Sequence, residues 1–138
     1  MQNVHGKWTL VATLIVSALG YFVDVYDIVL FSVLRVPSLV DLGTSPEAIT
    51  HIGSELLRTQ MWGILLGAFI WGILGDKRGR TFVILGSILI YSVATLLNGF
   101  VQTVEQYHIL RFIAGFGLAG ELGAAITLVA EITPQTKR

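Results

Sequence analysis

The sequence contains no cysteine, three prolines and few charged residues. Without cysteine, the chain can form neither a disulfide framework nor a thiolate metal site. Charged residues make up 13% of the 138 positions, which is about half of the ~25% that is usual for a soluble domain. Their formal net charge is zero, so there is no basic excess to attract nucleic acid or an acidic substrate. We therefore expect no nucleic-acid partner.

Long apolar runs dominate the chain, which is 54% hydrophobic and has a mean hydropathy of +0.75. Crossing a hydrocarbon core of ~30 Å takes about 20 helical residues. Four apolar runs of about that length cover residues 8–34, 58–75, 81–101 and 107–132. Because lipid cannot hydrogen-bond an exposed backbone, these runs predict an all-α membrane protein with four transmembrane helices. The lipid bilayer is then the first partner of the chain.

The positions of the cations predict the orientation of these helices. Six of the nine Lys and Arg residues fall on one side of a four-span topology, and three lie toward the other. The six are Lys7, Lys77, Arg78, Arg80, Lys137 and Arg138. Because Lys and Arg are retained on the cytoplasmic side, the N-terminus is predicted to be cytoplasmic. The first apolar run exceeds the ~7–15 residues of a signal-peptide core, so we expect a retained anchor.

Two acids interrupt the first apolar run, and an arginine interrupts the fourth. Asp24 and Asp27 are separated by three positions, so they share one face of a helix. An isolated charge at that depth costs at least about 2.5–3.5 kcal/mol. We therefore expect both acids to face a polar cavity and Arg111. Asp27 is favoured for the pair with Arg111 and Asp24 for the proton, but the sequence does not separate the two roles, and either acid can carry the proton. Glu121, in the fourth run, belongs to the same candidate set. A purely structural ion pair is the alternative reading.

The loop between the second and third runs carries the most specific motif. It reads GILGDKRGRT and contains Gly72, Asp76, Lys77, Gly79 and Arg80. Glycine at position 79 permits a sharp reversal that a Cβ atom would obstruct. The pattern resembles the signature between the second and third helices of the major facilitator superfamily of secondary transporters. In that family, the Asp, Gly and Arg of the signature latch helices together at the cytoplasmic side.

The fourth run resembles the fourth helix of the same superfamily. The family pattern Arg-x-x-x-Gly-x-Gly matches Arg111, Gly115 and Gly117. The segment from Glu131 to Arg138 resembles the Glu…Pro…Arg element that closes that helix. The resemblance implies that Glu131 pairs with the basic loop. It also implies that Glu131 and Arg138 belong to the cytoplasmic gating motif.

The resemblance implies a fold and a function. Members have twelve helices in two halves with the substrate between them, so this chain would be part of the N-terminal six-helix half, and the remaining helices would be its partners. The spacing from Gly20 through Asp24 to Asp27 is similar to that of metabolite:proton symporters, and Asp24 to Asp27 also resembles the motif of aromatic acid:proton symporters. Both imply proton-coupled symport of a small organic anion or zwitterion in a bacterial inner membrane.

Two other functions fit a four-helix membrane chain. A complete small multidrug exporter would act as a dimer, and a noncatalytic assembly subunit would need only the hydrophobic helices. No residues in the sequence support an enzymatic function, because it has no Walker loop, nucleophile elbow or zinc-protease motif. No cofactor is expected. The three histidines, at positions 5, 51 and 108, are too far apart in the sequence to indicate a metal site.

Overall fold

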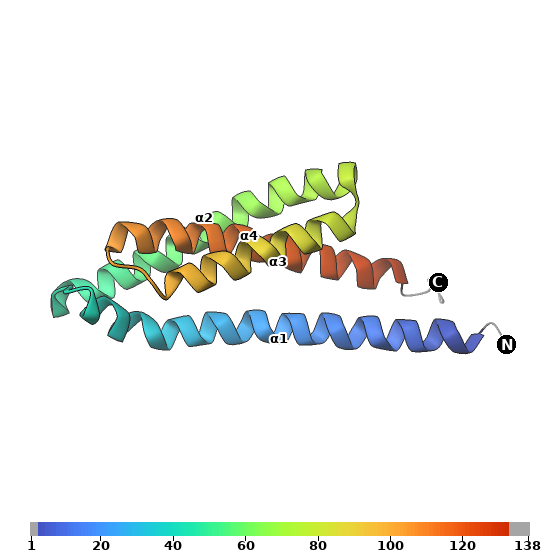
Figure 1. Cartoon of the computed structure of the whole chain (residues 1–138), viewed down its shortest axis with the longest axis horizontal. Helices are drawn as coiled ribbons and strands as arrows, with labels where there is room; N and C mark the ends of the chain where they lie inside the picture. The colour runs from blue at the N-terminus through green and yellow to red at the C-terminus, as the bar shows by residue number, and fades with distance from the viewer. Residues whose placement is uncertain (1–2, 133–138) are drawn as a thin grey trace.

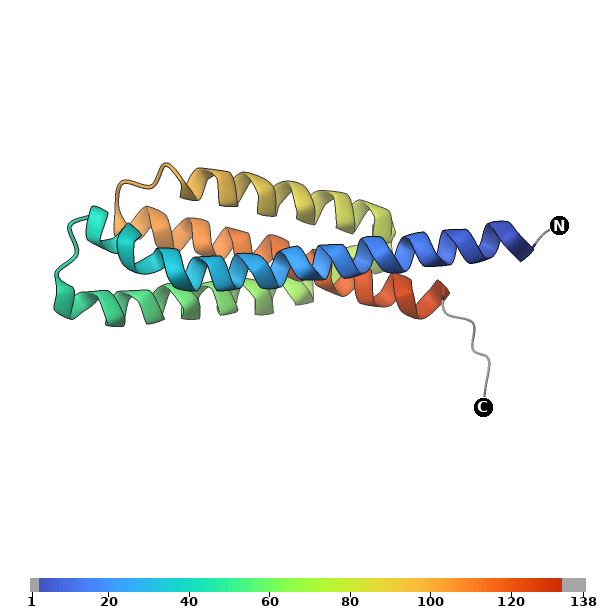
Figure 2. The ribbon, with the colours of Figure 1, turned by 90° about the horizontal axis from the view of Figure 1, so that it is seen from below.

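The computed structural model describes the backbone of residues 3–132, which folds into four long helices without a strand in that range (Figure 1). The helices are α1 (Asn3–Asp41), α2 (Pro46–Arg78), α3 (Arg80–Asn98) and α4 (Val104–Ile132). This arrangement confirms the predicted all-α fold. The α1–α2 and α3–α4 connections lie at one end of the bundle, and the α2–α3 turn lies at the other end (Figures 1 and 2).

Helix α4 packs against the other three helices, and glycines allow the closest of these contacts. Gly63 and Gly67 of α2 lie against the α4 backbone at Phe112 and Phe116. On the opposite side of α4, Gly117 lies against α3, where an added Cβ atom would be 2.7 Å from the backbone nitrogen of Tyr91. Small residues permit such backbone contact where lipid provides no hydrophobic force between helices. The side chain of Trp71 also joins α2 to α4, because its indole N–H donates a 2.8 Å hydrogen bond to the Phe116 carbonyl.

Helix α1 is longer than the apolar run that predicted it. It continues through Pro37 to Asp41, so only residues 42–45 connect α1 to α2. The extension is held by packing, since Leu39 and Leu56 are both fully buried in a cluster with Phe31 and Tyr107. This cluster joins α1, α2 and α4 near the end of the bundle that contains the α1–α2 connection.

The ends of α2 and α3 follow local backbone rules. Helix α2 begins at Pro46, after the N-cap residue Ser45, and proline suits the first position of a helix because it needs no N–H donor there. A single residue, Gly79, separates α2 from α3 and has a φ of 87°. Its N–H donates to the Gly75 carbonyl at 3.1 Å. Helix α3 ends at Asn98, three residues before the end of the predicted span, where the chain turns through Gly99.

Two helices in the described part of the chain, α2 and α3, are each long and apolar enough to cross a membrane. Only part of α1 and α4 has described side chains, because those of residues 1–10 and 124–138, among others, are outside the described set. The four membrane spans predicted from the sequence correspond in position to the four helices, and their insertion in a bilayer stays a prediction.

Candidate functional site

Asp27 of α1 and Arg111 of α4 meet inside the bundle. The carboxylate Oδ2 and the guanidinium Nη1 are 3.9 Å apart, and the two side chains are only 14% and 7% exposed. Neither of these atoms has a hydrogen-bond partner among the described residues, and neither does the Arg111 Nε. The two groups therefore form a loose ion pair in which both partners keep unused hydrogen-bonding capacity.

Two aromatic rings hold Arg111 in this position. The guanidinium carbon lies 3.6 Å from the centre of the Phe31 ring and 5.9 Å from that of Tyr107. The two rings are themselves packed edge to face, with their centres 5.9 Å apart and their planes at 89°. A cation over an aromatic face is attracted by the ring quadrupole, and the attraction grows when water is excluded. The rings thus hold the cation in place while its Nε and Nη1 atoms have no hydrogen-bond partner in the described part of the chain.

The other predicted acids lie close to this pair. Asp24 is buried and interacts electrostatically with both Asp27 and Glu121. The Glu121 carboxylate lies against Gly20 of α1, where an added Cβ atom would be 3.5 Å from Oε1. Tyr91 of α3 is within electrostatic range of Asp27. The structure therefore brings the four predicted residues of the site together on α1 and α4, and adds a tyrosine from α3.

A cavity of about 750 Å³ lies beside the ion pair, between α1, α3 and α4. Asp27 and Arg111 line it, together with apolar and aromatic side chains such as Leu30, Phe31 and Tyr107. Residues of the α3–α4 connection also line the cavity, so it extends toward that end of the bundle. This volume is within the ~300–1,000 Å³ range of small-molecule sites.

The predicted gating motif lies at the opposite end of the bundle. A second cavity of about 210 Å³ is lined there by Gly72, Asp76 and Arg80, together with glycines of α4. Lys77 is exposed, and Gly79 forms the turn. The side chain of Glu131 and all of Arg138 lie outside the described residues. The proposed pairing of Glu131 with the basic loop therefore stays a prediction.

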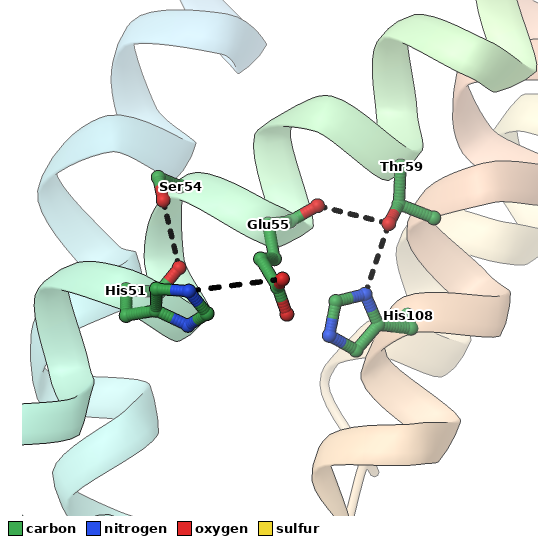
Figure 3. A network of polar contacts seen from close by, with 5 residues as sticks. All are labelled: His51, Ser54, Glu55, Thr59 and His108. Carbon is green, nitrogen blue, oxygen red and sulfur yellow. Dashed lines mark hydrogen bonds and ion pairs between the residues drawn. The ribbon is translucent and has the colours of Figure 1, made fainter.

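A separate polar network joins α2 to α4 near the end of the bundle that contains the α1–α2 connection (Figure 3). The Thr59 hydroxyl donates to the Glu55 carbonyl at 2.9 Å and also contacts His108 Nδ1 at 3.0 Å. Since the hydroxyl proton is already used, Nδ1 of His108 must be the donor in the second contact. His51 Nε2 lies 3.9 Å from the Glu55 carboxylate. No group of three potential ligands suited to a metal ion occurs in the described part of the chain.

Apolar helices that enclose charged side chains are typical of integral membrane proteins. The chain belongs to the Major Facilitator Superfamily, whose family model matches residues 7–138. This match confirms the resemblance seen in the two sequence motifs. Because the family comprises transporters, it argues against an enzyme. It also argues against the small exporter and the assembly subunit considered from the sequence alone.

Several bacterial transporters are similar to this chain. The benzoate transport protein of Acinetobacter baylyi is 34% identical over 127 residues, which cover 88% of this chain and 26% of that protein. The niacin transporter NiaP of the same organism is 34% identical over 122 residues, which cover 86% of this chain and 26% of that protein. The gentisate transporter of Corynebacterium glutamicum is 30% identical over 112 residues, which cover 81% of this chain and 24% of that protein. This chain therefore spans about a quarter of the length of each relative. No solved structure matches it.

Proposed function

We propose that this chain forms the first four helices of a proton-coupled secondary transporter for small organic anions. The observation that carries the proposal is the loose Asp27–Arg111 pair at the wall of the 750 Å³ cavity. Ionisable residues at membrane depth are costly, and they occur mainly along substrate and proton routes. In the complete transporter, the remaining helices would close the cavity from the other side, as alternating access requires.

The geometry supports a specific order of events. Arg111 is the cation on the cavity wall, and its Nε and Nη1 groups lack hydrogen-bond partners, so a substrate carboxylate would bind there. Binding draws the guanidinium away from Asp27. A carboxylate that loses its counter-ion in a site shielded from water binds a proton more readily. Proton and substrate would then cross the membrane together. Asp24 offers a second carboxylate that can bind the proton.

The substrate class follows from the lining of the cavity and from the relatives. Phe31, Tyr107 and aliphatic side chains surround the cation, which suits a flat apolar ring that carries one carboxylate. Three of the similar proteins are named for benzoate, niacin and gentisate, which are all aromatic or heteroaromatic monocarboxylates, whereas others are named for sialic acid and inorganic phosphate. We infer that the substrate of this transporter is a small molecule of the same class.

Uptake experiments test the proposal. Proteoliposomes that contain the full-length transporter should accumulate benzoate or niacin when the outside is acidic, and a protonophore should abolish the accumulation. Arg111→Lys should lower uptake about tenfold, because lysine keeps the charge but loses the planar fork that binds a carboxylate at two points. Accumulation that does not depend on the proton gradient would contradict proton coupling. Normal uptake by Arg111→Lys would show that Arg111 does not bind the substrate.

Cysteine labelling tests the proposed orientation. These 138 residues contain no cysteine, so a single cysteine introduced here is the only thiol in this part of the chain. Lys77 is exposed near the α2–α3 turn, and Glu105 is exposed at the start of α4. An impermeant maleimide should label Glu105→Cys in intact cells, and should label Lys77→Cys only after the cells are opened. The reverse pattern would place the N-terminus outside.

A further inference from the structure

The cavity beside Arg111 has two walls of different chemistry. Asp27 and Arg111 supply charge from α1 and α4, whereas the end of α3 contributes Thr95 and Asn98, which are polar but neutral. Ser38 and Asp41 of α1 and Gln102 of the α3–α4 connection also line the cavity. A ligand whose carboxylate binds Arg111 therefore presents the rest of its surface to apolar side chains and to polar groups that include the neutral wall of α3. The α3 wall has no role in the transport mechanism described above.

Asn98 is the member of this wall that lacks partners. Neither its Oδ1 nor its Nδ2 has a hydrogen bond in the described structure, and both atoms are covered by neighbouring groups. A buried polar group without a partner destabilises the fold, because its hydrogen bonds to water are lost and not replaced. A short rotation of the side chain into the adjoining cavity would give the amide access to a ligand.

The side chain of Asn98 is not needed to end helix α3. The turn after the helix is closed by the backbone, because the Gly99 N–H donates to the Leu96 carbonyl at 3.2 Å and the Phe100 N–H donates to the Leu97 carbonyl at 3.0 Å. Capping of helix α3 therefore does not account for the amide side chain of Asn98. Asparagine also packs less favourably than leucine in such a place, so its polar atoms call for a reason outside the fold.

We propose that Asn98 determines substrate specificity by binding a neutral hydrogen-bonding group, such as a ring hydroxyl, on the aromatic carboxylate held by Arg111. This inference rests on the proposed function. An amide offers one donor group and one acceptor, and a hydroxyl can satisfy both. A second carboxylate would find no cation on the α3 wall. The favoured substrates are then monocarboxylates that carry a hydroxyl group.

Competition experiments test the role of Asn98. Uptake of labelled benzoate by the full-length transporter is measured against unlabelled benzoate, 3-hydroxybenzoate and 4-hydroxybenzoate. The wild type should bind at least one hydroxybenzoate about tenfold more tightly than benzoate, as one or two net hydrogen bonds would give. Asn98→Leu should bring this ratio close to one. Because leucine has nearly the same shape and leaves no polar atom unpaired, this variant should express at least as well as the wild type.

Two further variants separate recognition from packing. Leu97→Ala changes an exposed neighbour and should keep the preference for the hydroxybenzoate. Asn98→Asp adds a negative charge and should weaken binding of all three anions. A preference that survives in Asn98→Leu, or its absence from the wild type, would overturn this inference while leaving the transport function standing. Failure of the wild type to take up any of the three acids would overturn the proposed function and this inference with it.

Discussion

Replacing Gly63 with alanine is expected to prevent α2 from packing on α4. The added methyl group would overlap the carbonyl oxygen of Phe112 and lie 3.1 Å from the backbone nitrogen of Phe116. Both atoms belong to the backbone of α4, so neither can turn aside as a side chain can. Overpacking usually costs about 1–3 kcal/mol, and we expect at least the upper end here because a whole helix must shift.

The matched control lies on the same helix. Gly72 has no atom within 4 Å of the place where its Cβ would be, and alanine favours a helix over glycine by about 1 kcal/mol. Gly72→Ala should therefore be as stable as the wild type or more so. Yield of the monodisperse protein and its melting temperature in detergent measure both variants. Equal melting temperatures would show that the contact between α2 and α4 is not tight.

Replacing Asp27 with asparagine is expected to abolish accumulation of substrate against a gradient. Asparagine has the same shape but cannot take up and release a proton, so the variant loses the group that we propose to couple the two fluxes. Exchange of labelled for unlabelled substrate requires no net proton movement, and it should continue at a reduced rate. The loss should be at least tenfold for accumulation, and much smaller for exchange.

The measurement compares the two modes in the same proteoliposomes. Glu47→Gln removes an exposed acid at the start of α2 and should leave both modes unchanged. If Asp27→Asn still accumulated substrate when the outside was acidic, the coupling proton would have to bind elsewhere, with Asp24 as the first candidate. If exchange and accumulation fell together, Asp27 would serve binding and not coupling.

Much of the fold could be predicted from hydropathy, because apolar runs bounded by charge identify helices that must satisfy their own backbone in lipid. The same reasoning missed the last turns of α1. The segment around Pro37 looks like a loop in sequence, yet Leu39 is held in a helix by burial against Leu56. Tertiary packing decides such an extension, and hydropathy does not register it.

The site could be predicted only in part. Helical spacing and depth were enough to suggest that Asp27 lies near Arg111, and the structure places them 3.9 Å apart. The stacking of Arg111 on Phe31 depends on how each helix is rotated, which spacing alone does not determine. Asn98 gave no signal, because a single asparagine at the end of an apolar run looks like an ordinary helix terminus.

The cluster of Phe31, Leu39, Leu56 and Tyr107 anchors the C-terminal part of α1. From Phe31, the helix continues toward the N-terminus for about 36 Å to Lys7, but Asp27 is only about 6 Å away, at 1.5 Å per residue. A tilt of about 10° around that cluster would move the N-terminal end of α1 by roughly 6 Å and shift the Asp27 carboxylate by about 1 Å. With such a tilt, a small change in the distance between Asp27 and Arg111 is accompanied by a displacement about six times larger at the N-terminal end of α1.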